Sequence, residues 1–384
     1  MAGSTISSGN KTTRFQKEVA REYVRGGKFE RYIGNDQNAI IQVNRNLKKV
    51  SIPLIAKLSG GGVTGSATLT GNEEALSNYD FTLQPTYKRN GVVIDNEENE
   101  LSEFDLFSEA RPALMNWAME LKRNEIIQAM GAVIAGTTYV NYGGAKGATG
   151  AGAATAGNMD TWNTNNQDRI LYGEGSAVND SGNHTTSLGG VTTASGKMDA
   201  DIVRMLKRMA ENADPLIRPH MIRGDEPWYV LFIGTYAFRD LQADLATLHS
   251  NGMPRDESNP LWAGGDLLID GVVVKKVPEI DSVFIDGTTA QNADFGGVWG
   301  ANATGDSLAT GGDSSSRVSM GFLCGAQAVG FGNGRVPGFA SRKEDDYEHL
   351  SGVGVSCKSD IKKTFYNSKQ HGIVTSFHSS TGDT

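Results

Sequence analysis

Four residues near the start of the chain have the types and spacing of a nucleotide-binding site. Gly60, Gly62 and Gly65 follow a strand-like segment with the G-x-G-x-x-G spacing of the dinucleotide fingerprint. Asp80 lies near the distance at which an acidic residue would bind the ribose. Gly60 and Gly65, followed by Ser66, also fit most of the phosphate-loop pattern G-x-x-x-x-G-K-S/T. A nucleotide-binding enzyme is therefore the first hypothesis to weigh.

The residues around these glycines do not supply what either motif needs. A phosphate loop has a lysine after its last glycine, whereas Ser66 follows Gly65 here, so the contact to the β and γ phosphates is missing. Both motifs also place the phosphates at the N-terminus of a helix. The following stretch "SATLTGNEEALSN" has Ala67 and Leu69 at strand spacing and Gly71 as a breaker. We interpret the glycines as a flexible loop tip and keep nucleotide binding as a remote alternative.

The other residues that could do chemistry are scattered along the chain. The six histidines show no H-E-x-x-H motif, and no G-x-S-x-G elbow is present. Cys324 and Cys357 are the only cysteines and lack metal-ligand spacing, so we expect two reduced thiols. The charged run "RKEDDYEH" (342–349) lacks the spacing of a calcium loop and favours a solvated face or a subunit contact. We predict no catalytic, cofactor-binding or metal-ligating residues.

Composition indicates a folded but loop-rich protein. Of the 384 residues, 38% are hydrophobic and 21% are charged, while 48 are glycine, roughly twice the usual share. The net charge of −8 argues against a nucleic-acid reader, which would carry a basic stripe, but allows a wall that surrounds nucleic acid. The sequence shows no signal peptide and no membrane span, so we expect folding in a cytoplasm without a membrane partner.

The first segment with clear periodicity is a short amphipathic helix. In "TRFQKEVAREYVRGGKF" (13–29), Phe15, Val19 and Tyr23 recur at helical spacing before two glycines. Such a short helix on a polar arm has nothing of its own to bury against, so it needs a partner surface.

A two-stranded ribbon is predicted around the glycine stretch. Residues 49–58 and 81–88 each alternate apolar and polar side chains, the pattern of a strand. Pro53 and Pro85 cannot donate hydrogen bonds to a central sheet, which favours a narrow ribbon. Because an isolated ribbon is marginally stable in water, the ribbon and the arm are expected to lie on neighbouring copies of a self-assembling lattice.

The pattern of the remaining segments predicts the α+β fold class. Residues 101–136 form the strongest helical segment, with Leu114, Trp117 and Leu121 on its apolar side and Gly136 as its end. The glycine-rich stretch 143–197 is interpreted as a flexible or surface insertion. Three further signals are a helix capped by Asp199, a helix capped by Thr235, and a hairpin turn at Asp270–Gly271.

This order of parts resembles a known architecture. An arm, a long β-hairpin, a long helix and a compact α+β lobe resemble the Johnson fold of tailed-phage major capsid proteins. More specifically, the chain resembles the capsid family of podoviruses that carry a giant virion RNA polymerase. The stretches that carry the resemblance span roughly residues 80–378 in the family's order and are "TYKRNGVVID", "WYVLFIGTYAFRDLQAD", "NPLWAGGDLLIDGVVVKKV", "GFLCGAQAVGFG" and "DIKKTFYNSKQHGIVT".

The resemblance implies a division of the chain into five parts. They would be an N-terminal arm (1–47), an extended β-hairpin loop that lies across an adjacent subunit (48–95), a peripheral domain with a spine helix and the glycine-rich insertion (96–200), an axial domain at capsomer centres (201–345), and a return to the peripheral domain (346–384). The contact residues expected on the arm and the extended loop are Phe15, Val19, Tyr23, Lys57, Leu58, Gly60, Gly62, Gly65, Leu69, Tyr79, Phe81 and Tyr87. Some relatives crosslink a loop lysine to a neighbour's asparagine; Lys57 fits by position only, and we do not expect it to react.

The resemblance also implies the function. Copies of the chain would form hexamers and pentamers of an icosahedral shell around a double-stranded DNA genome, with no catalytic activity and no cofactor. The protein would be assembled in the host cytoplasm and reside in the virion. Its partners would be other copies of itself and a portal protein, with scaffolding and decoration proteins as further candidates and non-specific contact with packaged DNA. The alternative from the same fold is an encapsulin-like compartment.

Overall fold

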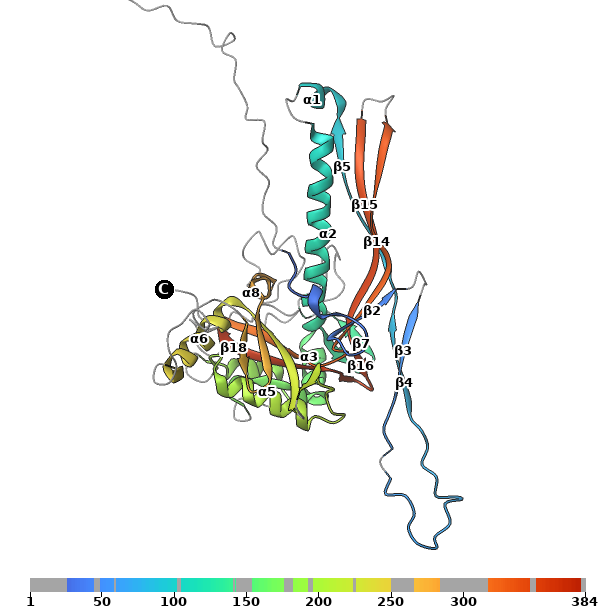
Figure 1. Ribbon diagram of the computed structural model, residues 1–384, viewed down its shortest axis with the longest axis vertical. Helices are drawn as coiled ribbons and strands as arrows, with labels where there is room; N and C mark the ends of the chain where they lie inside the picture. The colour runs from blue at the N-terminus through green and yellow to red at the C-terminus, as the bar shows by residue number, and fades with distance from the viewer. Residues whose placement is uncertain are drawn as a thin grey trace, which may run out of the picture. The chain divides into compact units, whose positions relative to one another are not determined.

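The chain divides into two compact units. The computed structural model describes residues 26–44, 49–58, 60–101, 105–140, 142, 154–175, 182–192, 196–223, 226–249, 266–283, 317–345 and 350–380 (Figure 1). The first unit is built mainly from Thr86–Lys122 and Arg335–Lys358, and the second from Lys28–Pro85, Arg123–Gly334 and Ser359–Thr384. The predicted arm residues Phe15, Val19 and Tyr23 lie outside the described residues.

The first unit packs a helix against strands. Its elements are β5 (Thr86–Asp95), α1 (Asn96–Leu101), the first part of α2 (Leu106–Met130), and parts of β14 (Val329–Asp345) and β15 (Leu350–Lys363). Leu114 of α2 is buried together with Ile94 of β5 and with Val353 and Val355 of β15, and Trp117 packs against this cluster. Residues three or four apart share a helix face, so this side of α2 faces the strands as the sequence predicts.

The second unit contains a mixed sheet with the strand order β11-β12-β10-β13-β18-β8, to which β9 is added along β10. Its strands are β8 (Ile170–Tyr172), β9 (Met221–Arg223), β10 (Glu226–Ile233), β11 (Leu267–Ile269), β12 (Val272–Lys276), β13 (Arg317–Cys324) and β18 (Ile373–Ser380). Its helices are α3 (Ala156–Asn165), α4 (His184–Gly189), α5 (Ala200–Asn212), α6 (Thr235–His249) and α8 (Pro278–Val283), with short 3-10 turns η2 (Glu30–Tyr32) and η3 (Gln167–Arg169). Parallel pairs (β10 with β12, β18 with β8) and antiparallel pairs occur in one sheet, which confirms the α+β class.

Smaller sheets complete the described structure. They are the five-stranded order β1-β2-β14-β15-β5, with β1 (Ile33–Gly34) and β2 (Ile40–Asn44), and the pairs β3 (Val50–Ile55) with β4 (Asn78–Leu83), β6 (Val133–Ala135) with β7 (Thr138–Val140), and β16 (Phe365–Tyr366) with β17 (Lys369–Gln370). None of the helices in the described ranges is long and apolar enough to cross a membrane.

Alternation along the strands gives the large sheet two buried faces. On β13, Met320 and Phe322 belong to a core that also contains Trp162 of α3, while Leu323 belongs to a second core formed with α5 and α6. Successive side chains of a strand point to opposite faces, so helices cover both sides of the sheet. The burial of Trp162 contradicts the interpretation of 143–197 as a flexible insertion, because its described residues build α3, β8 and α4.

The helix ends follow the prediction in part. The Asp199 carboxylate accepts a hydrogen bond from the Ile202 amide at 2.7 Å, which confirms the predicted cap. Thr235 is not a cap but the first residue of α6, and its amide donates to the carboxylate of Asp281, a residue of α8. The long helix ends at Met130, so the predicted end at Gly136 is wrong. Gly136 instead has a φ of 65° in the turn between β6 and β7.

Buried histidines make the fold sensitive to acid. His378 on β18 is fully buried and neither ring nitrogen has a hydrogen-bond partner. Burial lowers the pKa of His378 to about 3 and, with a smaller repulsion from Arg169, lowers the pKa of His371 to about 4. The unfolded chain binds these protons near pH 6.5, so stability is full above that pH and falls as the pH approaches the folded-state values.

The variant His378→Leu should remove much of this acid sensitivity. Each pH unit between the two pKa values of one histidine contributes about 1.4 kcal/mol, so at pH 4.5 the wild type loses roughly 2–3 kcal/mol through His378. Urea unfolding at pH 7 and pH 4.5 measures the difference, which should shrink by that amount in the variant. His220→Leu, at a half-buried histidine, should change the difference less. An unchanged difference in His378→Leu would assign the acid sensitivity elsewhere.

Candidate assembly interface

The predicted ribbon is present. β3 and β4 pair antiparallel in a two-stranded sheet whose register runs from Val50 opposite Leu83 to Ile55 opposite Asn78. The Ala56 amide extends the pairing by a hydrogen bond to the Ser77 carbonyl at 3.0 Å. Figure 1 shows the two strands side by side and the loop continuing beyond their ends.

The end of the ribbon around Phe81 and Leu83, which we call its foot, is anchored in its own subunit. Phe81 is 1% exposed and its ring centroid lies 5.7 Å from that of Phe365 and 6.3 Å from that of Tyr366. Gly330 on β14 allows this approach, because a Cβ there would lie 2.8 Å from the Phe81 ring. The Gln84 amide donates to the Asp360 carboxylate at 2.7 Å just beyond the foot. These contacts fix the direction in which the ribbon leaves the core.

The loop at the far end has few contacts of its own. The Gly60 amide donates to the Glu74 carboxylate at 2.7 Å, and the Gly71 amide donates to the Glu73 carboxylate at 2.7 Å. Gly62 and Gly71 have φ values of 65° and 88°, which disfavour any residue with a Cβ. Turns and irregular backbone, rather than a helix, follow Gly65, so the context required for nucleotide binding is absent from the described residues 60–78.

Large apolar side chains of the ribbon and loop face solvent. Ile55 is 63% exposed, Leu69 is 57% exposed and Leu76 is 61% exposed, and Leu58 is similarly open. Exposed leucines are common singly, but several on one segment make it a candidate binding surface. The subunit leaves this surface uncovered while it anchors the other end of the same ribbon.

The predicted contact residues therefore separate into groups. Those that lie together and exposed on the loop are Lys57, Leu58, Gly60, Gly62, Gly65 and Leu69. Tyr79 is half-buried and packs against the cluster around Phe81, and Tyr87 is exposed on β5 in the first unit. Phe81 belongs to its own subunit's core, so we remove it from the contact set. Of the predicted helix core, Leu114 is buried, whereas Trp117 and Leu121 are half-buried.

Sequence reasoning missed part of this surface. Ile55 and Leu76 are among the most exposed apolar residues of the ribbon, yet the prediction did not include them. Ile55 could have been found from its register, because it lies on the opposite face of β3 from Leu54, which packs against the cluster around Phe81. Leu76 has no comparable signal, since it lies in irregular backbone.

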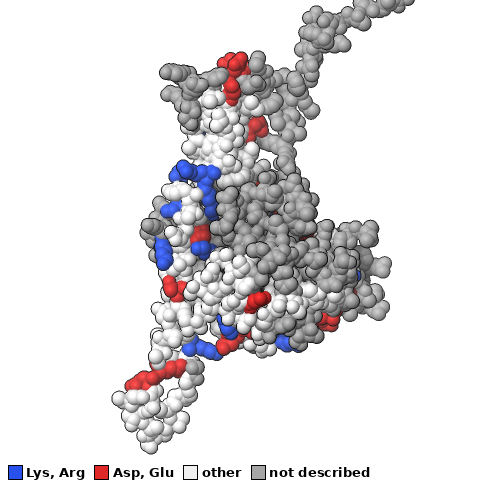
Figure 2. Space-filling view, turned by 180° about the vertical axis from the view of Figure 1, so that it is seen from behind, with Lys and Arg blue, Asp and Glu red and all other residues white. Residues whose placement is uncertain are grey.

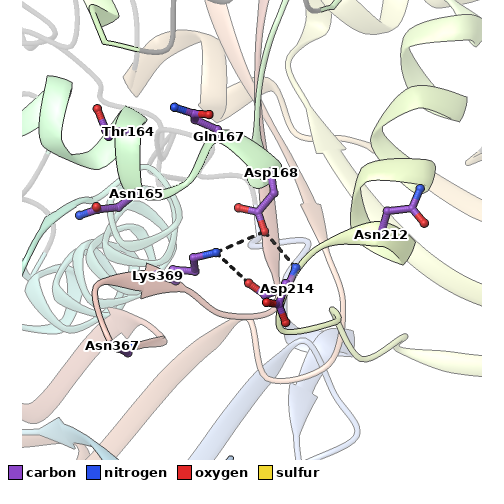
Figure 3. A pocket seen from close by; sticks show the side chains of 8 residues that line it. All are labelled: Thr164, Asn165, Gln167, Asp168, Asn212, Asp214, Asn367 and Lys369. Carbon is purple, nitrogen blue, oxygen red and sulfur yellow. Dashed lines mark hydrogen bonds and ion pairs between the residues drawn. The ribbon is translucent and has the colours of Figure 1, made fainter. Parts of the chain in front are cut away.

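A cavity among the described residues of the second unit is a further place where a small molecule could be considered. It has a volume of about 490 Å³ and is lined by Thr164, Asn165, Gln167, Asp168, Asn212, Asp214, Asn367 and Lys369 (Figure 3). The Asp168 carboxylate accepts from the Asp214 amide at 3.0 Å and lies 3.8 Å from the Lys369 ammonium, which donates to the Asp214 carbonyl at 2.9 Å. These charged groups hold the end of α5 against the β16–β17 hairpin, and no histidine, cysteine or serine lines the cavity.

Buried polar side chains elsewhere also serve packing. The His184 ring lies between two tyrosine hydroxyls, Nε2 at 2.9 Å from Tyr142 Oη and Nδ1 at 2.5 Å from Tyr172 Oη. Burial raises the pKa of Tyr172 well above its usual value, so its hydroxyl stays protonated. Within the described residues no group of three or more histidine, cysteine or acidic side chains could hold a metal ion.

Comparisons with known proteins show the class of protein to which this fold belongs. Residues 4–379 match the family described as "Phage capsid protein". The major capsid protein of Pseudomonas phage KPP25 is 28% identical over 338 residues, which cover 85% of this chain and 81% of that protein. The cyanophage Pam1 capsid asymmetric unit superposes with a TM-score of 0.84 at 30% identity over 100% of both chains. The capsid of Ralstonia phage GP4 shares the fold, with a TM-score of 0.66 at 17% identity over 100% of both chains.

The chain belongs to the phage capsid protein family. It is a major capsid protein, whose copies form the icosahedral shell of a phage, and it is a component of the virion. The three relatives named here are all phage capsid proteins, which agrees with the Johnson-type fold predicted from the order of its parts.

The variant Phe81→Ala should release the foot of the ribbon without unfolding the subunit. Removing a buried phenylalanine costs about 3–5 kcal/mol, and here the loss falls on the contacts that hold β4. Hydrogen exchange should become faster at the amides of β3 and β4 than at those of β13. Leu69→Ala, which truncates an exposed side chain of similar size, should leave exchange unchanged. Equal protection of β4 in Phe81→Ala and in the wild type would refute the anchoring role.

Proposed function

We propose that the chain assembles into hexamers and pentamers around a double-stranded DNA genome, and that its ribbon and loop bind across an adjacent subunit. The observation that carries this proposal is the contrast within one ribbon, whose foot is buried around Phe81 while Leu69 and Leu76 at its far end stay exposed. An exposed apolar loop on an anchored support suits a partner surface outside the subunit.

The energetic reason is the burial of the loop's apolar side chains. Fully burying a leucine or isoleucine contributes about 1.5–3 kcal/mol, and these side chains are more than half exposed in the subunit. Four of them (Ile55, Leu58, Leu69 and Leu76) contribute roughly 4 kcal/mol or more per contact before association costs. In a shell every subunit makes the same contact, and the symmetry of the assembly allows the shell to close.

The domain roles follow the family's plan. We assign the arm to residues 1–47, the extended loop to 48–95, the peripheral domain to 96–200, the axial domain to 201–345, and the return segment to 346–384. A portal protein would occupy one vertex, and scaffolding and decoration proteins are further candidate partners. The protein would act without enzymatic activity.

The acidic balance supports weak contact with the genome. A wall whose subunits each carry a net charge of −8 would repel DNA phosphates overall, so it would not hold the genome tightly. Contact with packaged DNA would therefore be non-specific, and burial between subunits would dominate the stability of the shell.

Deleting residues 58–77 should leave a soluble, folded subunit that fails to form closed shells. The deletion removes the exposed loop and keeps the buried foot, so far-UV circular dichroism and thermal unfolding should stay close to those of the wild type. Negative-stain electron microscopy of the expressed protein gives the readout. Normal shells from the deletion variant would refute the bridging role. Replacing the loop by a glycine-serine linker of equal length serves as a control for chain length.

Isothermal titration with ATP and with NAD should show no binding at micromolar concentrations. The glycines at 60, 62 and 65 form loop turns and lack the helix that a phosphate site requires. Binding at micromolar affinity that Gly62→Ala abolishes would overturn the structural assignment of this loop.

A further inference from the structure

One end of the β5–β15 strand pair, in the first unit, carries cations on an exposed face. The Lys358 ammonium lies 5.5 Å from the centroid of the Tyr87 ring, which is 59% exposed. Arg89 follows Tyr87 by two residues on β5, so both side chains point to the same face of the sheet. Arg89 is exposed and Lys358 is partly exposed, so the two cations share one open face.

The other end of the same strand pair carries carboxylates. β5 ends at Asp95 and leads directly into α1, where Glu97 and Glu100 are exposed. Residues three apart are neighbours on a helix surface, with about 5–6 Å between their Cβ atoms, so the two carboxylates form one acidic face. The hydrogen bond between Ser351 Oγ and Asn96 Oδ1, at 2.9 Å, holds the start of α1 beside β15.

The two charged ends are too far apart to pair within one subunit. Arg89 and Asn96 are seven residues apart, which corresponds to roughly 23 Å along a strand. In physiological salt, screening limits the range of the electrostatic interaction between exposed charges to about 8 Å. Among the described residues, Arg89, Lys358, Glu97 and Glu100 form no ion pair, so these two cations at one end of this strand pair and these two carboxylates at the other end have no partner of opposite charge there. Figure 2 shows a group of acidic side chains (red) at the top and a group of basic side chains (blue) below it, with both signs mixed farther down the same face.

We propose that the acidic face of α1 in one copy docks against the basic face of β5 and β15 in a second copy. Glu97 and Glu100 would then meet Arg89 and Lys358, and the partner is another molecule of this chain. The two carboxylates, about 5–6 Å apart, would face two cations on adjacent strands, with Lys358 beside Tyr87 and Arg89 two residues farther along β5. Since each copy carries both faces, the contact is head-to-tail and closes into a ring when the rotation fits.

A second copy fits this basic face better than packaged DNA does. DNA presents one phosphate about every 1.7 Å of its axis, and a wall that binds it needs a long basic stripe. Here the two cations occupy a small face beside the exposed Tyr87. The inference rests on the assembly proposed above and adds the surfaces that meet in it.

Reciprocal charge reversal tests the contact. One variant carries Arg89→Glu with Lys358→Glu, a second carries Glu97→Lys with Glu100→Lys, and a third combines all four. Each double reversal places like charges together and should raise the protein concentration needed for shell formation by about 10-fold or more. The four-residue swap restores opposite charges and should return this concentration to within about 3-fold of the wild type. Sedimentation and negative-stain microscopy give both readouts.

Controls separate this contact from assembly as such. Arg208→Glu with Glu174→Lys reverses two exposed charges in the second unit and should leave shell formation unchanged. Closed shells from this control and from the wild type establish assembly independently of the swap. If a double variant fails to fold by circular dichroism, the single reversals Arg89→Glu and Glu97→Lys and their combination replace it. Absence of rescue in the combined variant overturns the proposal. Normal shells with reduced DNA content in the basic-face reversal also overturn it and assign the cations to DNA.

Discussion

The burial of Phe81 against Phe365 and Tyr366 is the contact on which the position of the ribbon depends, and with it the proposed assembly role. This contact anchors one end of a ribbon that could not hold its position alone, since two strands in water are marginally stable. Beyond the foot, β3 and β4 stay paired as far as Ile55 and Asn78, and this pairing keeps the ribbon extended. A rigid base thus presents an uncovered apolar segment, which in the proposed assembly would lie against a neighbouring subunit.

The loop itself is built for adaptation rather than rigidity. Its shape rests on a few hydrogen bonds from glycine amides to Glu73 and Glu74, and on glycines with positive φ such as Gly62. Ordering such a segment on a partner costs conformational entropy, which lowers the affinity of each contact. That cost suits a shell, because contacts that are individually weak can dissociate and correct errors before symmetry closes the assembly.

The sequence predicted what short-range periodicity encodes and failed where distant residues decide. Alternation along residues 49–58 located the ribbon, and hydrophobic spacing located α2. Alternation could not tell whether Phe81 is buried in its own subunit or in a neighbour, because the two environments place the same demand on one face of a strand. The cap of α6 comes from Asp281, 46 residues from Thr235, which no local pattern shows. The glycine-rich composition of 143–197 likewise gave no sign that Trp162 is buried, because its burial depends on β18 and the rest of the sheet.

The net charge of −8 conceals the arrangement of charges that the proposed contact between copies would use. A sum over the chain predicts weak DNA binding, but it cannot show that Arg89 and Glu97 lie at opposite ends of one strand pair. Exposed ion pairs contribute at most about 1 kcal/mol each, so they would add little to the roughly 4 kcal/mol of apolar burial available to each loop. Their larger effect is on specificity, because like charges that meet in a wrong register are repelled. Apolar loops would therefore supply most of the affinity between subunits, while separated charges select the relative orientation in which that affinity is used.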